Sequence, residues 1–329
     1  MRTWFVFRMT CALALGAVIT LGAAQPRPGP ALPRVGILLP GPAGNAGNFD
    51  AFYKGMSDLG YVEGRNVVFE RSYGDFTEGR LRAQAAELVQ RRVDVIVAPG
   101  PASTRAAREA TSTIPIVMAT HDAVELGLVA SFGRPGGNVT GLSMLSSQLA
   151  TKQLALLKET LPGISRVAIL ANPATPGVAS IIRGLEIDGR SLGLRLHVIE
   201  VPGPDALADA FAAMKRERVE AFVVLPDTTV MDRMRDRIIA LAAEQRLPSM
   251  FQWRQNVDAG GLMSYGPDLR ALLRRTASYV QRILKGAQPG DLPVYLADDY
   301  ELVLNLRTAR AIGVGFPQAL RIRAADKIE

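Results

Sequence analysis

Short apolar runs alternate with amphipathic stretches along most of the chain, which is the pattern of buried strands connected by helices. Residues 93–98 form one such run, and a Pro/Gly turn separates it from Ser103 and Thr104, where a helical pattern begins. In residues 75–92 and again in residues 205–218, apolar side chains recur with the spacing of one helical face. Because parallel sheets carry helices on both faces, the pattern predicts a doubly wound α/β fold with parallel sheets.

Several strand-like segments occur twice, in the same order and at similar separations. The pairs are residues 34–44 with 166–177, 92–103 with 218–229, 114–120 with 247–253, and 136–143 with 260–267. One match of this length has little weight, but several in a single order indicate a duplicated unit. We therefore predict two similar Rossmann-like lobes with a ligand cleft between them, where the carboxyl ends of the strands face each other.

The first residues have the composition of a secretory signal peptide. Arg2 and Arg8 precede an apolar run over residues 9–22, and small residues then precede Gln25. We predict that residues 1–24 direct export and are removed by cleavage before Gln25. A membrane anchor is the alternative, but the apolar run is shorter than the ~20 residues that span a bilayer.

Composition narrows the classes of partner. The 329 residues, 48% of them hydrophobic, are enough for two domains, and residues 25–33 have the Pro-rich composition of an extended linker. Removing residues 1–24 takes away two of 38 basic residues and none of 31 acidic ones, so the net charge falls from +7 to +5. The charges are interspersed, as in residues 215–220 (KRERVE), which indicates a solvated surface and no nucleic-acid partner.

The sequence contains no complete catalytic motif. Residues 41–47 are glycine-rich but match neither common nucleotide-binding pattern, so we interpret them as a flexible loop rather than a phosphate cradle. Cys11, the single cysteine, lies in the predicted signal peptide, and His121 and His197 are the two histidines, so we expect no metal site and no cofactor. His121 stands beside Asp122 and could act as a general base, so an exported enzyme stays an alternative.

The carboxyl ends of the predicted strands supply the candidate ligand-binding residues, because ligands of such sheets bind there. In the first half these are Pro40, Asn45, Ser103, Thr104, Thr120, His121 and Asp122, and in the second half Asn172, Asp227, Thr228, Trp253 and Tyr265. All of them fall in or beside loops that we expect to line the cleft.

Two of these loops predict opposite charges on the ligand. The helix start at Ser103 and Thr104 favours a carboxylate, because its free N–H groups and its dipole attract anions. Asp227, in the equivalent loop of the second half, could bind an ammonium group, while Trp253 and Tyr265 could stack on an apolar portion. Each polar side chain could equally cap its own helix, and each ring could pack between the lobes.

Longer stretches of the chain resemble one protein family. They are residues 58–70 (DLGYVEGRNVVFE), 87–100, 111–119, 127–143 (GLVASFGRPGGNVTGLS), 153–173, 259–269, 279–294 and 301–313 (ELVLNLRTARAIG). From about residue 34 to residue 329, the sequence resembles the ABC-transporter substrate-binding proteins of the group that includes tryptophan-uptake binding proteins. The resemblance implies the type I periplasmic-binding fold, with two lobes joined by a three-segment hinge.

The same resemblance implies the lobe boundaries. The chain would cross between the lobes near residues 143–147, 265–267 and 296–300. The first lobe would then comprise residues 34–145 and about 267–296, and the second lobe residues 146–266 and about 297–329.

The resemblance also implies roles for individual residues. In type I amino-acid receptors, the loops after the third and fourth strands hold the carboxylate and the amine of the ligand. Here these loops contain Ser103 with Thr104, and Thr120 with Asp122. The family commonly has Gly-Asp-Pro-Val where this chain has residues 121–124, so Asp122 matches the family and its neighbours depart from it.

We therefore predict a periplasmic solute-binding protein of an ABC importer that captures an amino acid or a related carboxylate. It would act as a monomer, close its two lobes on the ligand, and deliver it to a membrane permease driven by an ATPase. The alternatives are an exported sensory receptor subunit and an enzyme that uses His121 and Asp122. A transcription regulator is disfavoured, because a signal peptide takes the place of a helix-turn-helix at the amino end.

Overall fold

The computed structural model describes residues 32–43, 49–225 and 227–329, and only the backbone of residues 228–232. The residues from 32 onward form one compact unit. The predicted signal peptide, most of the predicted linker and Asn45 lie outside the described residues.

The first sheet is parallel throughout its described strands. In the order β2, β1, β3, β4, β5 and β11, these strands are Val68–Tyr73, Arg34–Leu39, Val95–Pro99, Ile116–His121, Val139–Met144 and Tyr295–Leu296. Each neighbouring pair runs in the same direction. The strands are short apolar runs, and every residue of β5 is buried, as expected for a sheet that is covered on both faces.

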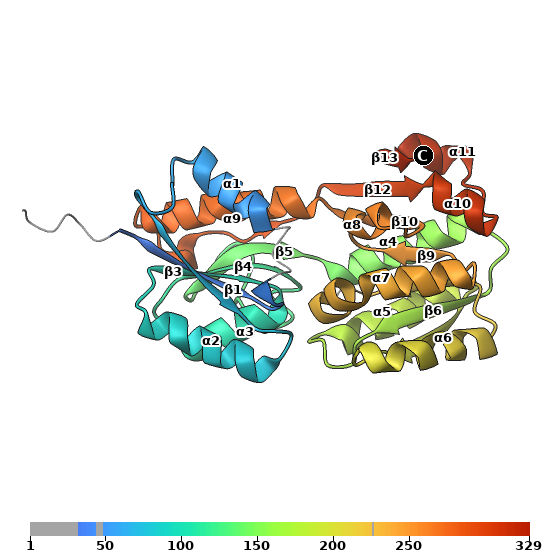
Figure 1. Ribbon diagram of the computed structural model, residues 1–329, viewed down its shortest axis with the longest axis horizontal. Helices are drawn as coiled ribbons and strands as arrows, with labels where there is room; N and C mark the ends of the chain where they lie inside the picture. Colours follow the sequence, from blue (N-terminus) through green and yellow to red (C-terminus); the bar gives the residue numbers. More distant parts are fainter. Residues whose placement is uncertain (1–31, 44–48, 226) are drawn as a thin grey trace, which may run out of the picture. The chain divides into compact units, whose positions relative to one another are not determined.

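Helices cover both faces of this sheet (Figure 1). One face carries α1 (Asp50–Asp58) and α9 (Leu269–Leu284), and the other carries α2 (Glu78–Gln90) and α3 (Pro101–Ala110). The alternation of side chains along β1 shows this division. Ile37 belongs to the apolar cluster with α1 and α9, whereas Leu38 belongs to the cluster with α2 and α3.

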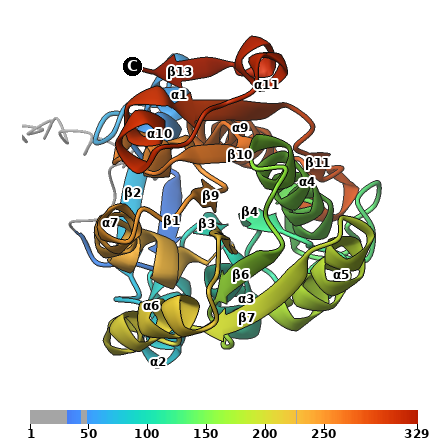
Figure 2. The same cartoon turned by 90° about the vertical axis from the view of Figure 1, so that its right-hand side faces the viewer.

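The second sheet repeats this arrangement. In the order β7, β6, β8, β9, β10, β12 and β13, its strands are Arg195–Glu200, Arg166–Ala171, Ala221–Val224, Ser249–Phe251, Met263–Pro267, Tyr300–Asn305 and Asp326–Ile328. One face carries α4 (Ser146–Thr160) and α5 (Val178–Ser191), and the other carries α6 (Leu207–Arg216) and α7 (Thr228–Glu244), as Figure 2 shows. The short helices are α8 (Arg254–Asp258), α10 (Leu306–Ile312), α11 (Gln318–Arg323) and the 3₁₀ turns Pro204–Ala206 and Pro289–Asp291.

The predicted α/β class is confirmed, and the two sheets share one strand order. The order β2-β1-β3-β4-β5 of the first sheet corresponds to β7-β6-β8-β9-β10 of the second. The repeated sequence segments occupy equivalent positions in this order, since they fall on β1 and β6, β3 and β8, β4 and β9, and β5 and β10. Two strands depart from the predicted parallel arrangement, because β12 is antiparallel to β10 and β13 is parallel to β12.

The direction of β12 follows from how the chain connects the two sheets. We call the elements around the first sheet the first lobe and those around the second sheet the second lobe. Within the described residues, the chain passes between the lobes from β5 to α4, from β10 to α9, and from β11 to β12. Since β12 enters the second sheet at the end where β10 leaves it, the two strands run in opposite directions.

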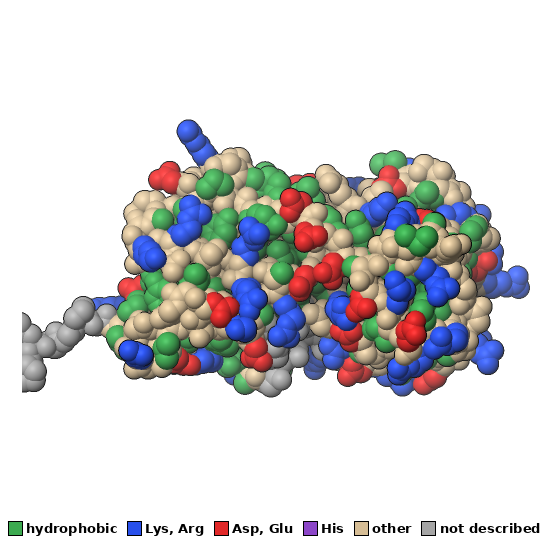
Figure 3. Space-filling view, turned by 90° about the horizontal axis from the view of Figure 1, so that it is seen from above, with side chains coloured by type: hydrophobic (Ala, Val, Ile, Leu, Met, Phe, Trp, Pro, Cys, Tyr) green, Lys and Arg blue, Asp and Glu red, His purple; other side chains and the backbone are tan. Residues whose placement is uncertain are grey.

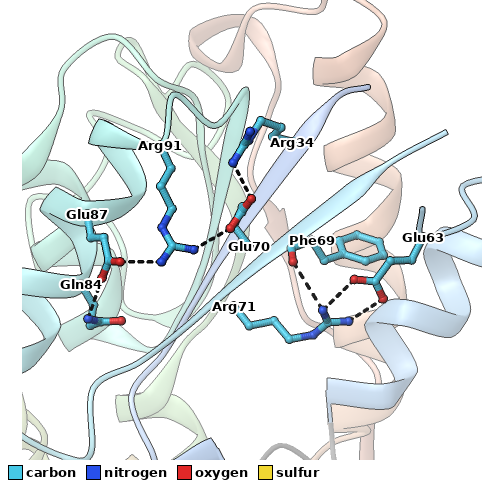
Figure 4. Close-up of polar contacts among 8 residues, drawn as sticks. All are labelled: Arg34, Glu63, Phe69, Glu70, Arg71, Gln84, Glu87 and Arg91. Carbon is cyan, nitrogen blue, oxygen red and sulfur yellow. Dashed lines mark hydrogen bonds and ion pairs between the residues drawn. The ribbon is translucent and has the colours of Figure 1, made fainter. Parts of the chain in front are cut away.

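An ion-pair network connects the outer strand β2 to β1 and to the end of α2 (Figure 4). Glu70 of β2 accepts hydrogen bonds from Arg34 of β1 at 2.6 Å and from Arg91, at the end of α2, at 2.7 Å. Arg91 also donates to Glu87 of α2 at 2.5 Å. These pairs are partly exposed and individually weak, but together they join two strands and a helix at the edge of the sheet.

The surface charges are mixed, as the sequence pattern predicts. Figure 3 shows Lys and Arg side chains interspersed with Asp and Glu side chains on the face that it displays. In the part of the chain that the structure describes, no helix is both long enough and apolar enough to cross a membrane.

Candidate functional site

A cavity of about 340 Å³ lies between the carboxyl ends of the two sheets. In the first lobe its wall includes residues that follow β1 and β3 and the last residues of β4, and in the second lobe residues that follow β6, β8 and β9. These are equivalent loops of the two similar halves, so the cavity lies where such sheets bind their ligands. Its volume is within the range of small-molecule sites.

Several of the predicted ligand-binding residues lie on this wall. They are Pro40, Thr120 and His121 in the first lobe, and Asn172, Asp227 and Trp253 in the second. Trp253 follows β9 and packs against apolar clusters of both lobes, so its ring extends from the second lobe towards the first. A ring in this position offers a flat apolar contact to a ligand.

Ser103 and Thr104 are not on the wall, because α3 begins before them. The first residue of α3 is Pro101, and Gly100, with a φ of +79°, precedes it as the N-cap. The hydroxyl of Thr104 donates to two backbone carbonyls, at 2.9 and 2.8 Å, and Ser103 is fully buried. The helix start still reaches the cavity through residues 100–102, which line it in place of Ser103 and Thr104.

Asp122 also lies off the cavity wall. It bonds the backbone where the chain passes from β5 to α4. Its Oδ1 accepts a hydrogen bond from the backbone N–H of Ser146, the first residue of α4, at 2.9 Å. Its Oδ2 lies 3.3 Å from His121 Nδ1. The φ of Asp122 is +47°, in the left-handed region that Asp adopts more readily than most residues. Asp122 therefore joins the end of β4 to the start of a second-lobe helix, as a capping carboxylate does.

The remaining predicted residues have other places. Tyr265 lies on β10, off the cavity wall, and its ring centroid is 5.7 Å from that of Tyr300 on β12. Thr228 is the first residue of α7, and its side chain, like the whole of Asn45, lies outside the described residues. The ligand-binding roles assigned to these residues from sequence stay predictions.

A polar cluster on the second-lobe wall centres on Asp227. Its Oδ2 accepts hydrogen bonds from Asn172 Nδ2, at 3.2 Å, and from Thr175 Oγ1. Asn172 Oδ1 in turn accepts from the backbone N–H of Ala174 at 3.0 Å, which fixes the orientation of the amide. The loops after β6 and β8 are thereby joined around a carboxylate on the cavity wall. Thr175 was not predicted from the sequence, although it lies in the same loop as Asn172.

Two side-chain amides on the wall carry polar atoms that need a partner. Gln255 Oε1 and Asn256 Nδ2 are buried and have no hydrogen-bond partner among the described residues. Both residues belong to α8, and Asn256 is 2% exposed. Since buried polar groups are nearly always paired, two such atoms in neighbouring residues of the wall are unusual. Sequence reasoning missed both, because they lie in a short helix beyond the strand-end loop.

Most of the remaining wall is apolar. It includes Phe49, Phe76, Leu81 and Met144 of the first lobe. Among the described residues, no group of three or more His, Cys, Asp or Glu side chains could hold a metal ion. The cavity wall thus combines polar loops with apolar side chains, as small-molecule sites commonly do.

Comparison with known proteins extends this picture. Residues 37–328 match the model of a family described as ABC transporter substrate binding protein. A tyrosine-binding protein of Clostridioides difficile (strain R20291) is 28% identical over 264 residues, which cover 79% of this chain and 75% of that protein. A crystal structure of a conserved domain protein from Vibrio cholerae is 28% identical, with a TM-score of 0.84, and covers 90% of this chain and 100% of its own. The ABC domain of Streptococcus pneumonia in complex with L-Trp has the same TM-score of 0.84 at 22% identity, covering 91% and 100%.

Proposed function

This chain belongs to the family of ABC transporter substrate-binding proteins, and we propose that it captures a free α-amino acid in the cavity between its lobes. Its fold is that of the type I periplasmic binding proteins, in agreement with the fold predicted from the sequence. One observation carries the proposal: a helix start of the first lobe and an oriented carboxylate of the second lobe line the same cavity.

This pair of groups matches the two charges of an amino acid. At the start of α3 the first N–H groups have no partner within the helix, and together with the helix dipole they attract a carboxylate. Asp227 attracts an ammonium group. Because a carboxylate can accept about four hydrogen bonds, Asn172, Thr175 and a ligand can share it. A zwitterion held in this way contacts both lobes at once.

The tyrosine-binding relative supports an amino acid rather than a sugar. That protein is described by its binding of an α-amino acid with an aromatic side chain. The cavity of this chain has a matching composition, since Trp253 and several aliphatic residues share its wall with the charged groups.

We propose further that the two lobes close on the ligand by bending at the crossings. Residues 34–145 with about 267–296 would move as one domain, and residues 146–266 with about 297–329 as the other. Since opposite lobes would bind the two charges of the ligand, binding favours the closed arrangement. Closure also removes water from the cavity, which strengthens the electrostatic contacts inside it.

We propose that the protein works in the periplasm with a membrane permease and an ATPase. Residues 1–24 would direct the chain out of the cytoplasm and be removed, so that the mature monomer works in the periplasm. A membrane permease and its ATPase would receive the loaded, closed form. The family to which the chain belongs and the composition of its first residues support this arrangement.

Isothermal titration calorimetry of residues 25–329 against L-amino acids, organic acids and neutral sugars tests the proposal. We expect saturable binding of at least one amino acid, and recovery of that amino acid unchanged after incubation, which distinguishes binding from turnover by His121. Asp227→Asn should weaken the binding by about tenfold or more, because a charge-assisted hydrogen bond is lost. Asp205→Asn, at an exposed position off the cavity wall, is the matched control. Binding of neutral sugars alone would refute the proposal.

The transport role has its own test. Deleting the gene should abolish high-affinity uptake of the amino acid that the purified protein binds. Unchanged uptake, with binding intact in calorimetry, would favour the sensory receptor subunit over the importer.

A further inference from the structure

Two exposed residues of opposite charge line the cavity from opposite lobes, and we propose that they form an ion pair when the lobes close. They are Glu78 of the first lobe and Arg235 of the second. The inference rests on the proposed function, because it names residues that stabilise the closed arrangement without contacting the ligand.

The helices that carry these residues, α2 and α7, lie in different lobes (Figure 1). Glu78 is the first residue of α2, so it lies at the end of the helix that reaches the cavity. Arg235 lies in the second turn of α7, which begins directly after Asp227 of the cavity wall. Because helical side chains lean towards the N-terminus of their helix, the long side chain of Arg235 leans towards the cavity.

Both side chains lie at the rim of the cavity rather than in its depth. The side chain of Glu78 is 69% exposed and that of Arg235 is 35% exposed. The wall residues Thr120 and Asn172, by contrast, are 2% and 6% exposed. The two charges therefore keep much of their water in this structure, and their heads are accessible to a partner from the other lobe.

The distribution of charge on the wall leaves one attractive pairing between the lobes. Among the described residues of the wall, Arg235 is the one Lys or Arg side chain, and Glu78 is the one Asp or Glu side chain of the first lobe. Asp227, the other acidic residue of the wall, belongs to the same lobe as Arg235 and bonds Asn172 and Thr175. An ion pair of Glu78 with Arg235 would therefore join the two lobes.

The present partners of both residues are local and exposed. Glu78 Oε2 lies 3.8 Å from Arg82 Nη1, one turn along α2, and Arg235 Nε lies 2.9 Å from Oδ1 of the adjacent Asp236. Exposed pairs of this kind contribute little to stability, so exchanging them for a pair between the lobes costs little. Closure removes water around the new pair and strengthens its attraction, so the pair favours the closed arrangement.

A pair that forms only on closure changes the affinity for every ligand by the same factor. It stabilises the closed arrangement whichever amino acid is bound, and the apparent affinity rises with the population of that arrangement. A residue that contacts the ligand would instead affect some ligands more than others. For one ion pair at a closing cleft, we expect a factor of about three to ten.

Calorimetry with L-tyrosine, L-tryptophan and L-leucine tests the pair in a double-mutant cycle. Glu78→Gln and Arg235→Gln should each weaken the binding of every amino acid that wild type binds, by about threefold to tenfold. The double variant should bind within about twofold of the single variants, because the pair is lost only once. Exchanging the charges, with Glu78→Arg and Arg235→Glu together, should return the affinity to within about threefold of wild type.

Arg82→Gln and Arg237→Gln are the matched controls. Arg82 is the present partner of Glu78, and Arg237 is exposed on α7, but neither lies on the cavity wall, so the affinities should not fall. Additive losses in the cycle, or an exchange of charges that does not restore binding, would overturn the pair and leave the proposed function standing. A loss confined to one amino acid would also overturn it, by showing that Arg235 contacts the ligand.

Crosslinking tests the pair even if wild type binds none of these amino acids, a result that would refute the proposed function. Cys11, the single cysteine, lies in the predicted signal peptide, so residues 25–329 contain no thiol. A short bis-maleimide should join the thiols of the variant with Glu78→Cys and Arg235→Cys faster than those of the variant with Glu78→Cys and Arg237→Cys. A faster reaction would support the meeting of the two rim positions with or without a ligand. Equal rates would show that they do not meet and would overturn the inference.

Discussion

The ring of Tyr265 lies against the ring of Tyr300, with 5.7 Å between the centroids and 34° between the planes. Tyr265 is on β10, which leads into one crossing between the lobes, and Tyr300 begins β12, which follows another. The antiparallel register of these strands places Pro267 opposite Tyr300 and Leu302 opposite Tyr265. Burial raises the pKa of Tyr300 above 10, so its hydroxyl is neutral at physiological pH.

From this contact we predict that Tyr300→Ala destabilises the fold where the chain crosses between the lobes. Losing the ring pair lowers the free energy of unfolding by about 0.5–1.5 kcal/mol, in addition to the effect of the lost contact area, so the melting temperature should fall. Small-angle X-ray scattering should show a wider range of lobe separations without ligand. Tyr300→Phe retains the ring and is the control, with most of the stability kept. Identical melting curves for wild type and Tyr300→Ala would mean that the ring pair does not support the crossings.

Asp122 is predicted to act on stability and not on the ligand. Asp122→Ala removes the cap of α4 and leaves Ala in a left-handed conformation, so unfolding by urea should show a loss of roughly 2 kcal/mol. Asp122→Asn retains an oxygen acceptor and tolerates the same backbone, so it should cost only a few tenths of a kcal/mol. The affinity for the amino acid should stay within about threefold of wild type in Asp122→Asn. A loss of affinity of tenfold or more in this variant would instead place Asp122 on the ligand, as the family resemblance implies.

Asn256 is predicted to have opposite effects on stability and binding. Its buried Nδ2 has no partner among the described residues, so Asn256→Leu removes an unsatisfied group and should stabilise the empty protein by about 1–3 kcal/mol. The same change should weaken ligand binding by about tenfold, because Asn256 lines the cavity and a branched apolar side chain would replace its amide there. Calorimetry and urea unfolding measure the two effects separately.

His197 supplies the matched control for this experiment. Its Nε2 is also buried and also lacks a partner among the described residues, but His197 lies on β7, off the cavity wall. His197→Leu should therefore alter stability and leave the affinity unchanged. If both variants weaken binding equally, the effect of Asn256 is a general disturbance of the second lobe.

The duplicated fold was predictable because the same sequence segments occur in both halves, and the structure shows that even single hydrogen bonds are repeated. The backbone N–H of Arg34 donates to Asp94 at 2.7 Å, and that of Arg166 donates to Glu220 at 2.8 Å. These acidic residues stand at equivalent places in the repeated segments RVDV and RVEA. The antiparallel strand β12 was not predictable in this way, because it belongs to no repeat and its direction is set by the crossing that precedes it.

The site was predictable at the level of loops but not of side chains. Strand ends converge by topology, and this places Thr120, Asn172 and Asp227 on the cavity wall. A shift of two residues at the start of α3 is enough to turn Ser103 from the cavity into the core, and sequence patterns do not fix helix starts so closely. The leucines of α9 on the cavity wall, such as Leu273, carry no sequence signal at all, because an apolar residue of α9 that lines a cavity has the same pattern as one that fills the core.

The pair of Glu63 and Arg71 gives a prediction about pH. Arg71 donates to both carboxylate oxygens of Glu63, at 2.7 and 2.8 Å (Figure 4), and these hydrogen bonds lower the pKa of Glu63 below 4.5. Arg71 also donates to the hydroxyl of Tyr53, at 2.9 Å, which fixes the guanidinium. Because the folded state then binds a proton less readily than the unfolded state, the stability from this pair is fully present above pH 4.5. It is lost as the pH falls through the lowered pKa of Glu63.

Urea unfolding of Glu63→Gln at several pH values measures this contribution. At pH 7 the variant should be less stable than wild type by no more than about 1 kcal/mol, because the pair is largely exposed and screened by solvent. The difference should shrink towards zero below the lowered pKa of Glu63, where wild type also carries a neutral side chain. Glu125→Gln is the control, since Glu125 is exposed and forms no ion pair within the described residues, and it should match wild type at every pH. A difference for Glu63→Gln that stays constant from pH 7 to pH 3 would show that its cost is steric, and that the charge of Glu63 does not stabilise the fold.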